Sequence, residues 1–235
     1  MNWQATEIKT RERIIIALDL PTSEAALAVV RELSPHAGLF KIGLQLYTAA
    51  GPDMVRAVRD LGGRIFLDLK LHDIPNTVGR AVESAGSLGV EMQTIHLSGG
   101  RAMIEAAVLA APPEMLLLGV TVLTSVDQTS LHETGVDAPI EKQVLRLAQL
   151  GVESGIGGVV ASPLEIAALR RSHGSKLRIV TPGIRPRKVA TNDQKRTLTP
   201  AEALRAGADF LVIGRPITAA PNPRAALEQI LADAL

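Results

Sequence analysis

The sequence has no cysteine and very few aromatic residues. The absence of cysteine from all 235 positions excludes disulfide bonds, thiolate nucleophiles and cysteine-based zinc sites. Aromatic residues make up only 2% of the chain, so a core must be filled by leucine, isoleucine, valine and alanine. The same scarcity argues against a surface that binds single-stranded nucleic acid by stacking bases on aromatic rings.

A strong net charge and long apolar segments are also missing. The formal net charge is +1, which is too small to indicate a protein that binds duplex nucleic acid or a membrane surface. No uninterrupted apolar run reaches the length of a membrane span, and the first residues, MNWQATEIKTRER, lack the apolar centre of an export signal. The sequence therefore predicts a globular, cytoplasmic protein that binds neither nucleic acid nor a membrane.

Two kinds of segment alternate along the chain. Short runs of β-branched and aliphatic residues are each followed by a stretch rich in Ala, Leu, Glu and Arg with helical spacing. The near-continuous apolar character of the short runs is typical of parallel strands covered by helices. Eight strands are expected, at residues 13–19, 39–44, 64–70, 92–97, 115–122, 157–162, 177–183 and 209–215.

Eight strand–helix units in a chain of this length favour a closed (β/α)8 barrel, or TIM barrel, over an open doubly wound sheet. No low-complexity linker interrupts the chain, so residues 1–235 are expected to form a single catalytic domain. Helices are expected to start at Thr22 or Ser23, and after Ser162 and Thr199, because each of the last two precedes a proline.

Two connections are unusually long. Residues 124–142 follow the fifth expected strand, and residues 184–198 follow the seventh. Connections of this size without secondary structure are uncommon in compact domains and tend to be functional. Both leave the carboxyl ends of strands, the face on which barrel enzymes place their active sites.

Polar residues and glycines collect at that same face. The inward positions of a parallel barrel are expected to be apolar except at the catalytic mouth. Apart from Lys41, which lies within the second expected strand, these exceptions lie at or just after the strand ends, and the full set is Asp19, Lys41, Asp68, Lys70, His96, Thr121, Thr124, Ser162, Gly183, Arg185, Gly214 and Arg215. This distribution predicts an active site at the carboxyl ends of the strands, with His96 as a polar core residue or a supporting group.

The third expected strand lies in FLDLKLHDIPNTV, residues 66–78. Alternation places Asp68 and Lys70 on one face, side by side in the mouth, with the aliphatic residues on the other. Asp73 lies five residues beyond Asp68, up to ~16 Å away along an extended chain. It reaches the pair only if the chain turns back or if it belongs to a neighbouring subunit. Taken alone, Asp68 and Lys70 fit a structural ion pair equally well.

Two glycine–arginine motifs follow the last two expected strands. They are TPGIRP at residues 181–186 and VIGRP at residues 212–216. Barrels often bind phosphate with the loops after strands seven and eight. Each motif offers a glycine for close backbone approach and an arginine for charge-assisted hydrogen bonds to phosphate oxygens. Together they predict a phosphate site.

These motifs resemble those of the bacterial orotidine 5′-phosphate decarboxylase family over essentially the whole chain. The matching segments are ALD at 17–19, KIGLQLY at 41–47, FLDLKLHDIPNTV at 66–78, HLSGG at 96–100, VLTS at 122–125, TPGIRP at 181–186, DQKR at 193–196 and VIGRP at 212–216. The resemblance implies a carboxy-lyase that converts orotidine 5′-monophosphate to UMP in de novo pyrimidine biosynthesis, with neither a cofactor nor a metal.

The resemblance also implies roles for the catalytic residues. Lys70 is expected to stabilise the carbanion and donate the proton, beside Asp68 and in a charged chain with Lys41. Asp73 and Thr77 are expected to complete the active site of the partner subunit in a homodimer. Without the resemblance, Thr77 would fit a cap of the following helix equally well.

Substrate-binding roles are implied in the same way. Ribose is expected to bind to Asp19 and Lys41, and the pyrimidine edge to Thr124 or Ser125. The residues implied to contact the rest of the substrate are Thr77, Pro182 and, for the phosphate, Arg185, Gln194, Gly214 and Arg215. One departure concerns the loop that is expected to close over the phosphate. Between Arg185 and Gln194 it has no glycine, where bacterial relatives are expected to carry hinge glycines.

Two other functions compete with this interpretation. A keto-sugar phosphate decarboxylase or hexulose phosphate synthase carries a similar Asp-x-Lys-x-x-Asp run but uses Mg²⁺. Lys41 stands where such an enzyme is expected to carry an acid that supports the metal. A non-catalytic sensor of a phosphorylated ligand is the second alternative, and it would bind the nucleotide without consuming it.

Overall fold

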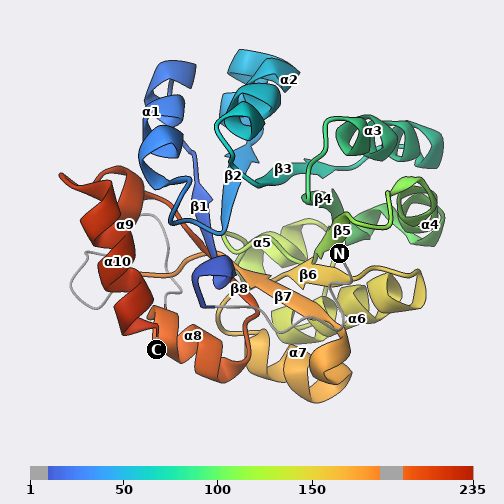
Figure 1. The fold of residues 1–235 in the computed structure, drawn as a ribbon. Coiled ribbons are helices and arrows are strands. Elements are labelled where there is room, and N and C mark those ends of the chain that lie inside the picture. The colour runs from blue at the N-terminus through green and yellow to red at the C-terminus, as the bar shows by residue number, and fades with distance from the viewer. Residues whose placement is uncertain (1–9, 186–197, 235) are drawn as a thin grey trace.

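Runs of buried aliphatic residues form all eight strands that the sequence predicts. The structure, a computed structural model, describes residues 10–185 and 198–234. The strands are β1 Ile14–Ala17, β2 Leu39–Gly43, β3 Ile65–Leu71, β4 Met92–His96, β5 Leu116–Val120, β6 Gly158–Val160, β7 Arg178–Thr181 and β8 Phe210–Ile213. Each strand pairs in parallel with the next and β8 pairs with β1, so the sheet closes (Figure 1). The predicted (β/α)8 barrel is confirmed.

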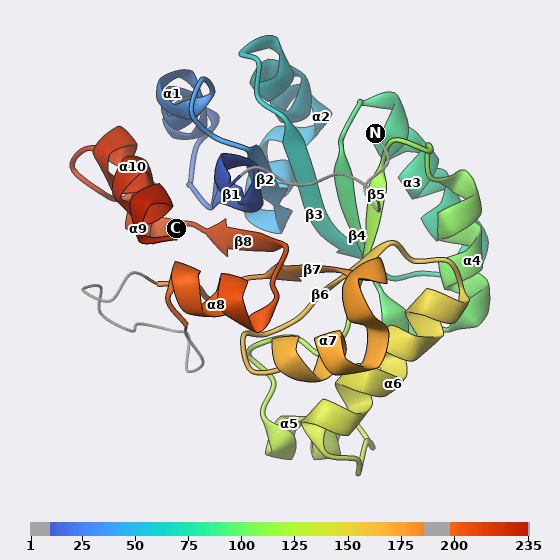
Figure 2. The same ribbon diagram turned by 60° about the horizontal axis from the view of Figure 1, so that its bottom comes forward.

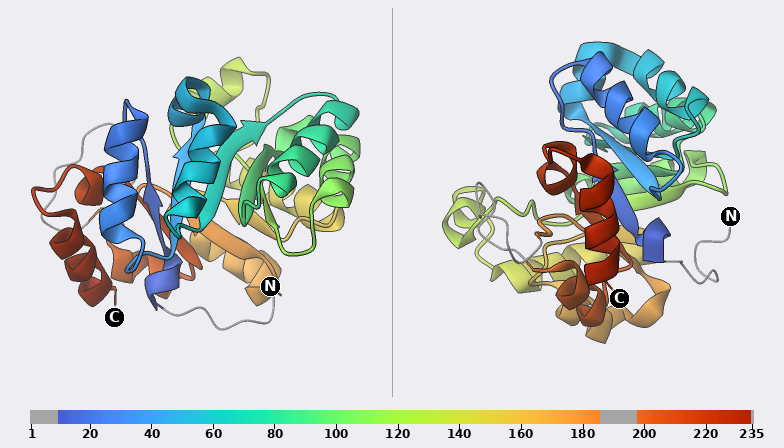
Figure 3. Two further views of the ribbon diagram at one scale, coloured as in Figure 1. Left: turned by 45° about the horizontal axis from the view of Figure 1, so that its top comes forward. Right: turned by 60° about the vertical axis from the view of Figure 1, so that its left-hand side comes forward.

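Helices cover the outside of the barrel (Figures 1 and 2). The α-helices are α1 Ser23–Leu33, α2 Leu44–Asp60, α3 Pro75–Ser87, α4 Arg101–Ala110, α5 Gln128–Glu133, α6 Ile140–Glu153, α7 Ile166–His173, α8 Pro200–Ala206, α9 Arg215–Thr218 and α10 Pro223–Asp233. Short 3-10 helices are η1 Thr10–Arg13, η2 Leu97–Gly99 and η3 Gly174–Lys176. The last helix, α10, lies beside α1, so the ring of helices closes as the sheet does (Figure 3). None of the helices that the structure describes is long and apolar enough to cross a membrane.

Side-chain caps explain two of the three expected helix starts. The Thr22 hydroxyl accepts a hydrogen bond of 3.3 Å from the Ala25 N–H at the start of α1. At the start of α8, Thr199 and Glu202 form a capping box, in which each side chain accepts from the backbone N–H of the other. Both starts are confirmed, with Thr22 rather than Ser23 as the first cap.

The helix expected directly after Ser162 starts later than predicted. Helix α7 begins at Ile166, and Pro163 lies in a turn that precedes it. The Glu165 carboxylate accepts a hydrogen bond of 2.7 Å from the Ser162 N–H, and the Glu165 N–H donates to the Ser162 carbonyl at 3.1 Å. These two bonds hold residues 162–165 as a closed turn, which is why the proline does not open the helix.

The core has an inner and an outer layer, because successive strand residues point to opposite faces of the sheet. Phe66 and Phe210 belong to the inner cluster that fills the barrel, and Phe40 belongs to the outer cluster between strands and helices. All three phenylalanines of the chain are fully buried. The remaining core residues are almost all aliphatic, as the composition predicts.

The two long connections behave differently from one another. The connection at residues 124–142 contains helix α5, so the expectation of a stretch without secondary structure is wrong there. The Asp127 carboxylate caps this helix by accepting a 2.9 Å hydrogen bond from the Ser130 N–H. In the second connection Ile184 and Leu198 form a parallel bridge, so its two ends lie together at the barrel mouth. Residues 186–197 lie outside the described part of the chain.

Candidate active site

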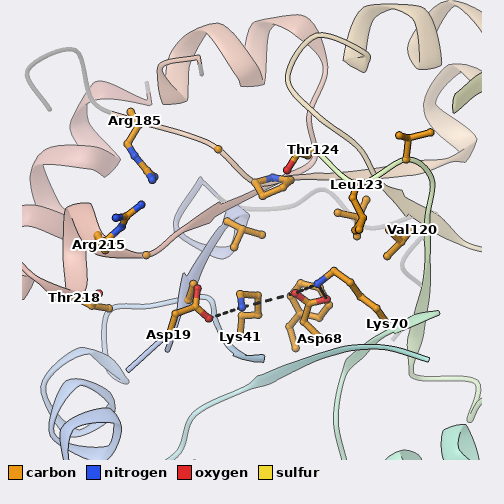
Figure 4. A pocket seen from close by; sticks show the side chains of 18 residues that line it. Asp19, Lys41, Asp68, Lys70, Val120, Leu123, Thr124, Arg185, Arg215 and Thr218 are labelled. Atoms are coloured by element: carbon orange, nitrogen blue, oxygen red, sulfur yellow. Dashed lines mark hydrogen bonds and ion pairs between the residues drawn. The ribbon is translucent and has the colours of Figure 1, made fainter. Parts of the chain in front are cut away.

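A cavity of about 410 Å³ opens at the carboxyl ends of the strands, inside the barrel mouth (Figure 4). Its lining residues are Ala17, Asp19, Lys41, Phe66, Asp68, Lys70, Val120, Val122, Leu123, Thr124, Val160, Pro182, Gly183, Arg185, Val212, Gly214, Arg215 and Thr218. These residues come from segments spread over the whole chain, and most of the polar strand-end residues singled out in the sequence are among them.

Four charged side chains form a row of alternating sign along one side of the cavity (Figure 4). The Lys41 ammonium donates to Asp19 Oδ1 at 2.8 Å and lies 3.8 Å from Asp68 Oδ2. The Lys70 ammonium lies 2.9 Å from both carboxylate oxygens of Asp68. The negative charges of the two carboxylates cancel the positive charges of the two ammonium groups. The row therefore places fixed charges inside the barrel without adding a net charge.

The backbone of β2 leaves space for this row. Lys41 is only 8% exposed although it is a charged residue within a strand. A Cβ at Gly43 would lie 2.8 Å from the Lys41 ammonium nitrogen and 3.3 Å from Asp19 Oδ1. Any side chain at position 43 would therefore displace the Lys41 ammonium. This close approach explains why the segment KIGLQLY has a glycine at this position.

Lys70 has a left-handed backbone conformation, with φ of 52°. It is the only non-glycine residue with positive φ within residues 10–185 and 198–234. For an ordinary residue this conformation costs roughly 1–2 kcal/mol, so the surrounding contacts must hold it. The contact at the Lys70 backbone N–H is a 2.9 Å hydrogen bond to the hydroxyl oxygen of Thr94, a residue that the sequence pattern did not single out.

The opposite side of the cavity carries the two arginines of the glycine–arginine motifs. Figure 4 shows Arg185 and Arg215 on the side of the cavity away from Lys70, with their guanidinium groups directed inward. Gly183 and Gly214 line the same region. The arrangement is suited to a ligand with an anionic group at one end, because guanidinium groups bind phosphate oxygens in a bidentate manner.

Apolar side chains also line the cavity. They include Phe66, Val120, Val160 and Val212, of which Phe66 and Val212 belong to the inner cluster of the barrel and Val160 packs against that cluster. The sequence pattern did not single out these residues as site residues, although strand alternation gives their inward phase. Such a surface excludes water and strengthens the electrostatic interactions beside it.

Not every residue named from the sequence lines the cavity. Thr124 and Pro182 are lining residues, whereas Ser125 is not. Asp73 and Thr77 are exposed and lie outside the lining, and Asp73 Oδ1 accepts a 2.6 Å hydrogen bond from the Ile74 N–H. Thr77 does not cap α3, because it lies within the first turn and Ile74 is the N-cap residue. Gln194 is outside the described residues.

His96 is not among the residues that line the cavity. Its ring packs against that of His72, with 5.4 Å between ring centroids and 35° between planes. Burial lowers the pKa of His96 below its ordinary value of 6.5, and the neighbouring His72 and Lys70 lower that pKa further. A neutral imidazole at this position agrees with a supporting polar residue.

A closed parallel barrel with an ionic cavity at its strand ends defines a (β/α)8-barrel enzyme. The chain belongs to the orotidine 5′-phosphate decarboxylase / HUMPS family, whose model matches residues 12–230.

Individual relatives cover nearly the whole chain. A protein from Opitutus terrae named orotidine 5′-phosphate decarboxylase is 55% identical over 94% of this chain and 97% of its own length. A protein of the same name from Moorella thermoacetica is 50% identical over 95% of this chain and 92% of its own. The crystal structure of orotidine 5′-phosphate decarboxylase from Lactobacillus acidophilus is similar with a TM-score of 0.84 and 38% identity, and covers 94% of this chain and 98% of that one.

Proposed function

We propose that this protein removes carbon dioxide from orotidine 5′-monophosphate and releases UMP, in de novo pyrimidine biosynthesis and without a cofactor. The observation that carries the proposal is the row of charges from Asp19 through Lys41 and Asp68 to Lys70 inside the cavity. Relatives 46–55% identical to the chain bear the name of this enzyme, which supports the same activity. We also propose that the whole chain is one catalytic domain that works in the cytoplasm.

The chemical step requires a positive charge beside one carbon atom. When carbon dioxide leaves, its bonding electrons remain on carbon six of the pyrimidine and cannot delocalise into the ring. The Lys70 ammonium, held by Asp68, is a preorganised cation for this developing charge. It then donates a proton to carbon six, which completes UMP. Repulsion between the substrate carboxylate and Asp68 or Asp73 adds a smaller contribution.

The phosphate supplies binding energy far from the reacting carbon. In this proposal Arg185 and Arg215 bind the phosphate, together with the backbone at Gly214 and with Gln194 from the loop that closes over it. Asp19 and Lys41 bind the ribose hydroxyls, and Thr124 binds the pyrimidine edge. Binding energy from the phosphate then drives closure and desolvation of the site and so accelerates the chemical step.

A homodimer completes the site in this proposal. Asp73 follows β3 yet lies outside the cavity of its own chain, which favours the second of the two alternatives for its role, a contribution to a neighbouring subunit. Two large apolar side chains are exposed after the neighbouring strands β2 and β3: Leu44, at 57% exposure, begins α2, and Ile74, at 67%, follows Asp73 and caps α3. A second copy that covers them would bring Asp73 and Thr77 into the partner's site.

The charged row also separates this function from its closest rival. A hexulose phosphate synthase or a related decarboxylase would have to hold Mg²⁺ at this site. Here the Asp68 oxygens face the ammonium groups of Lys70 at 2.9 Å and Lys41 at 3.8 Å, and both groups repel a divalent cation. The sensor alternative, in contrast, predicts a bound nucleotide that is not consumed.

One assay tests all three functions. Purified protein is incubated with orotidine 5′-monophosphate, and the ultraviolet absorbance of the orotate ring is followed with and without EDTA. The proposed function predicts conversion to UMP at a rate that EDTA does not change. Loss of activity in EDTA would favour the metal-dependent alternative, and tight binding without conversion would favour the sensor.

A further inference from the structure

The pairing of β3 and β4 shifts at Lys70. Residues 67–71 of β3 pair with residues 93–95 of β4, so four steps along one strand match two along the other. Three residues of β3, 68–70, therefore face Thr94 alone. A bulge of this kind turns the local backbone and redirects its side chains. The left-handed φ of 52° at Lys70 falls within this bulge.

The Thr94 hydroxyl joins the two ends of the bulge. Its oxygen accepts a hydrogen bond of 2.9 Å from the Lys70 backbone N–H. Its hydrogen is donated to Asp68 Oδ1, also at 2.9 Å. Because the backbone N–H is itself a donor, the hydroxyl hydrogen has only the carboxylate to bind between these two groups.

The contacts close into a ring through the Lys70 side chain. From Thr94 the ring runs to Asp68, from the Asp68 carboxylate to the Lys70 ammonium, and through the lysine back to its own N–H. Thr94 is fully buried, with 0% of its surface exposed, so water does not compete for its hydroxyl. Both the backbone and the ammonium of Lys70 are thus fixed by one neutral side chain.

We propose that Thr94 is a positioning residue, whose hydroxyl holds the Lys70 ammonium at the reacting carbon by fixing the Lys70 backbone and the Asp68 carboxylate together. The inference rests on the proposed function. This role requires the hydroxyl group of Thr94 and not its methyl group. Valine has nearly the same shape as threonine but can neither donate nor accept a hydrogen bond, so it removes the role alone. The effect falls on kcat, because the hydroxyl touches the catalytic pair and is not among the groups that line the cavity.

Four proteins test the proposal: wild type, Thr94→Ser, Thr94→Val and Thr94→Ala. Serine and alanine differ by the oxygen alone, and threonine and valine are matched in shape. We expect valine and alanine to lower kcat for orotidine 5′-monophosphate at least about 10-fold, in line with the effect of a misplaced catalytic group. KM and the Kd for UMP should change less than about 3-fold, and serine should retain kcat within about 3-fold of wild type.

The outcomes separate the proposal from its alternatives. It is overturned if valine and alanine keep wild-type kcat, or if serine loses as much as they do. Thermal unfolding of each variant identifies folding defects, and the proposal also fails if only the hydroxyl-containing proteins fold, because Thr94 would then be structural. A wild type that does not decarboxylate the nucleotide would instead refute the proposed function, and that result is seen before any variant is made.

Discussion

The ammonium group of Lys70 lies 2.9 Å from both carboxylate oxygens of Asp68, inside the mouth of the barrel. The same carboxylate faces the Lys41 ammonium at 3.8 Å and the Thr94 hydroxyl at 2.9 Å. Asp68 is therefore the centre of the row, and it fixes the position of the cation proposed to act on the substrate. Lys70 and the residues around this row each lead to a separate prediction.

Replacement of Lys70 by alanine is expected to abolish decarboxylation while the fold is kept. The variant loses both the charge at carbon six and the proton donor. Proton transfer alone contributes about 10²–10⁴-fold and a preorganised charge about 10²–10³-fold, so kcat should fall at least about 10⁴-fold. Absorbance of the orotate ring measures the loss, and circular dichroism tests the fold. Near-normal turnover would remove Lys70 from the reaction.

A lysine on the outer surface provides the matched control. Lys142 is exposed on α6, on the outside of the barrel. Its replacement by alanine also removes one positive charge but leaves the charged row intact. The Lys142→Ala variant should therefore retain wild-type kcat and KM, and a similar loss in both variants would point to net charge instead of position.

Replacement of Arg215 by alanine is expected to discriminate between substrates. A hydrogen bond to a charged group contributes about 1.5–3 kcal/mol, so kcat/KM for orotidine 5′-monophosphate should fall roughly 10- to 100-fold. The value for orotidine, which lacks the phosphate, should stay within about 3-fold. The exposed Arg205 on α8 is the control, and its alanine variant should affect neither substrate. Equal losses on both substrates for Arg215→Ala would contradict a phosphate role.

The lowered pKa of His96 predicts a loss of stability in mild acid. Its pKa in the folded protein lies below 6.5 because of burial and because of the neighbouring His72 and Lys70. At pH values near and below about 6.5 the unfolded chain therefore binds more protons than the folded chain. The free energy of unfolding falls as the pH drops through this range. His96→Gln should reduce this dependence, measured by urea unfolding at about pH 5.5 and pH 7.5.

A surface histidine is the control for this measurement. The His132 side chain is 70% exposed on α5, where its ion pair with Asp137 contributes little. His132→Gln should keep the wild-type difference between the two pH values. If His96→Gln keeps it as well, the acid sensitivity arises elsewhere, and His173, whose pKa is lowered by burial, is the next candidate.

The sequence predicted the fold because its signals are local. Alternation along each short run gave the strands, and it placed Phe66 inside the barrel with Asp68 and Lys70 beyond it at the mouth. Parallel pairing then requires that all the carboxyl ends meet on one face. For this reason Asp19, Asp68 and Lys70 could be placed at the same mouth without any structure, whereas the charged chain that includes Lys41 was implied only by the family resemblance.

The residues that the sequence did not indicate depend on distant contacts. Thr94 is a neutral, buried residue of β4, and it matters only because the register between β3 and β4 shifts opposite it. Gly43 matters because the Lys41 ammonium occupies the space of its missing side chain. The late start of α7 depends on the Glu165 carboxylate, which takes the Ser162 N–H into a turn. Propensity and spacing contain none of this information.

Mixed dimers test whether Asp73 acts in the partner's site. Asp73→Asn and Lys70→Ala are each expected to be inactive as homodimers, because every site lacks one group. In a heterodimer one site takes Lys70 from the Asp73→Asn chain and Asp73 from the Lys70→Ala chain, so that site is intact. Coexpression should restore about a quarter of wild-type activity, since half of the dimers are mixed and half of their sites are complete. Purification through two different tags should raise this to about half. If Asp73 acted in its own chain, every mixed site would lack one group, and the doubly tagged dimer would remain inactive.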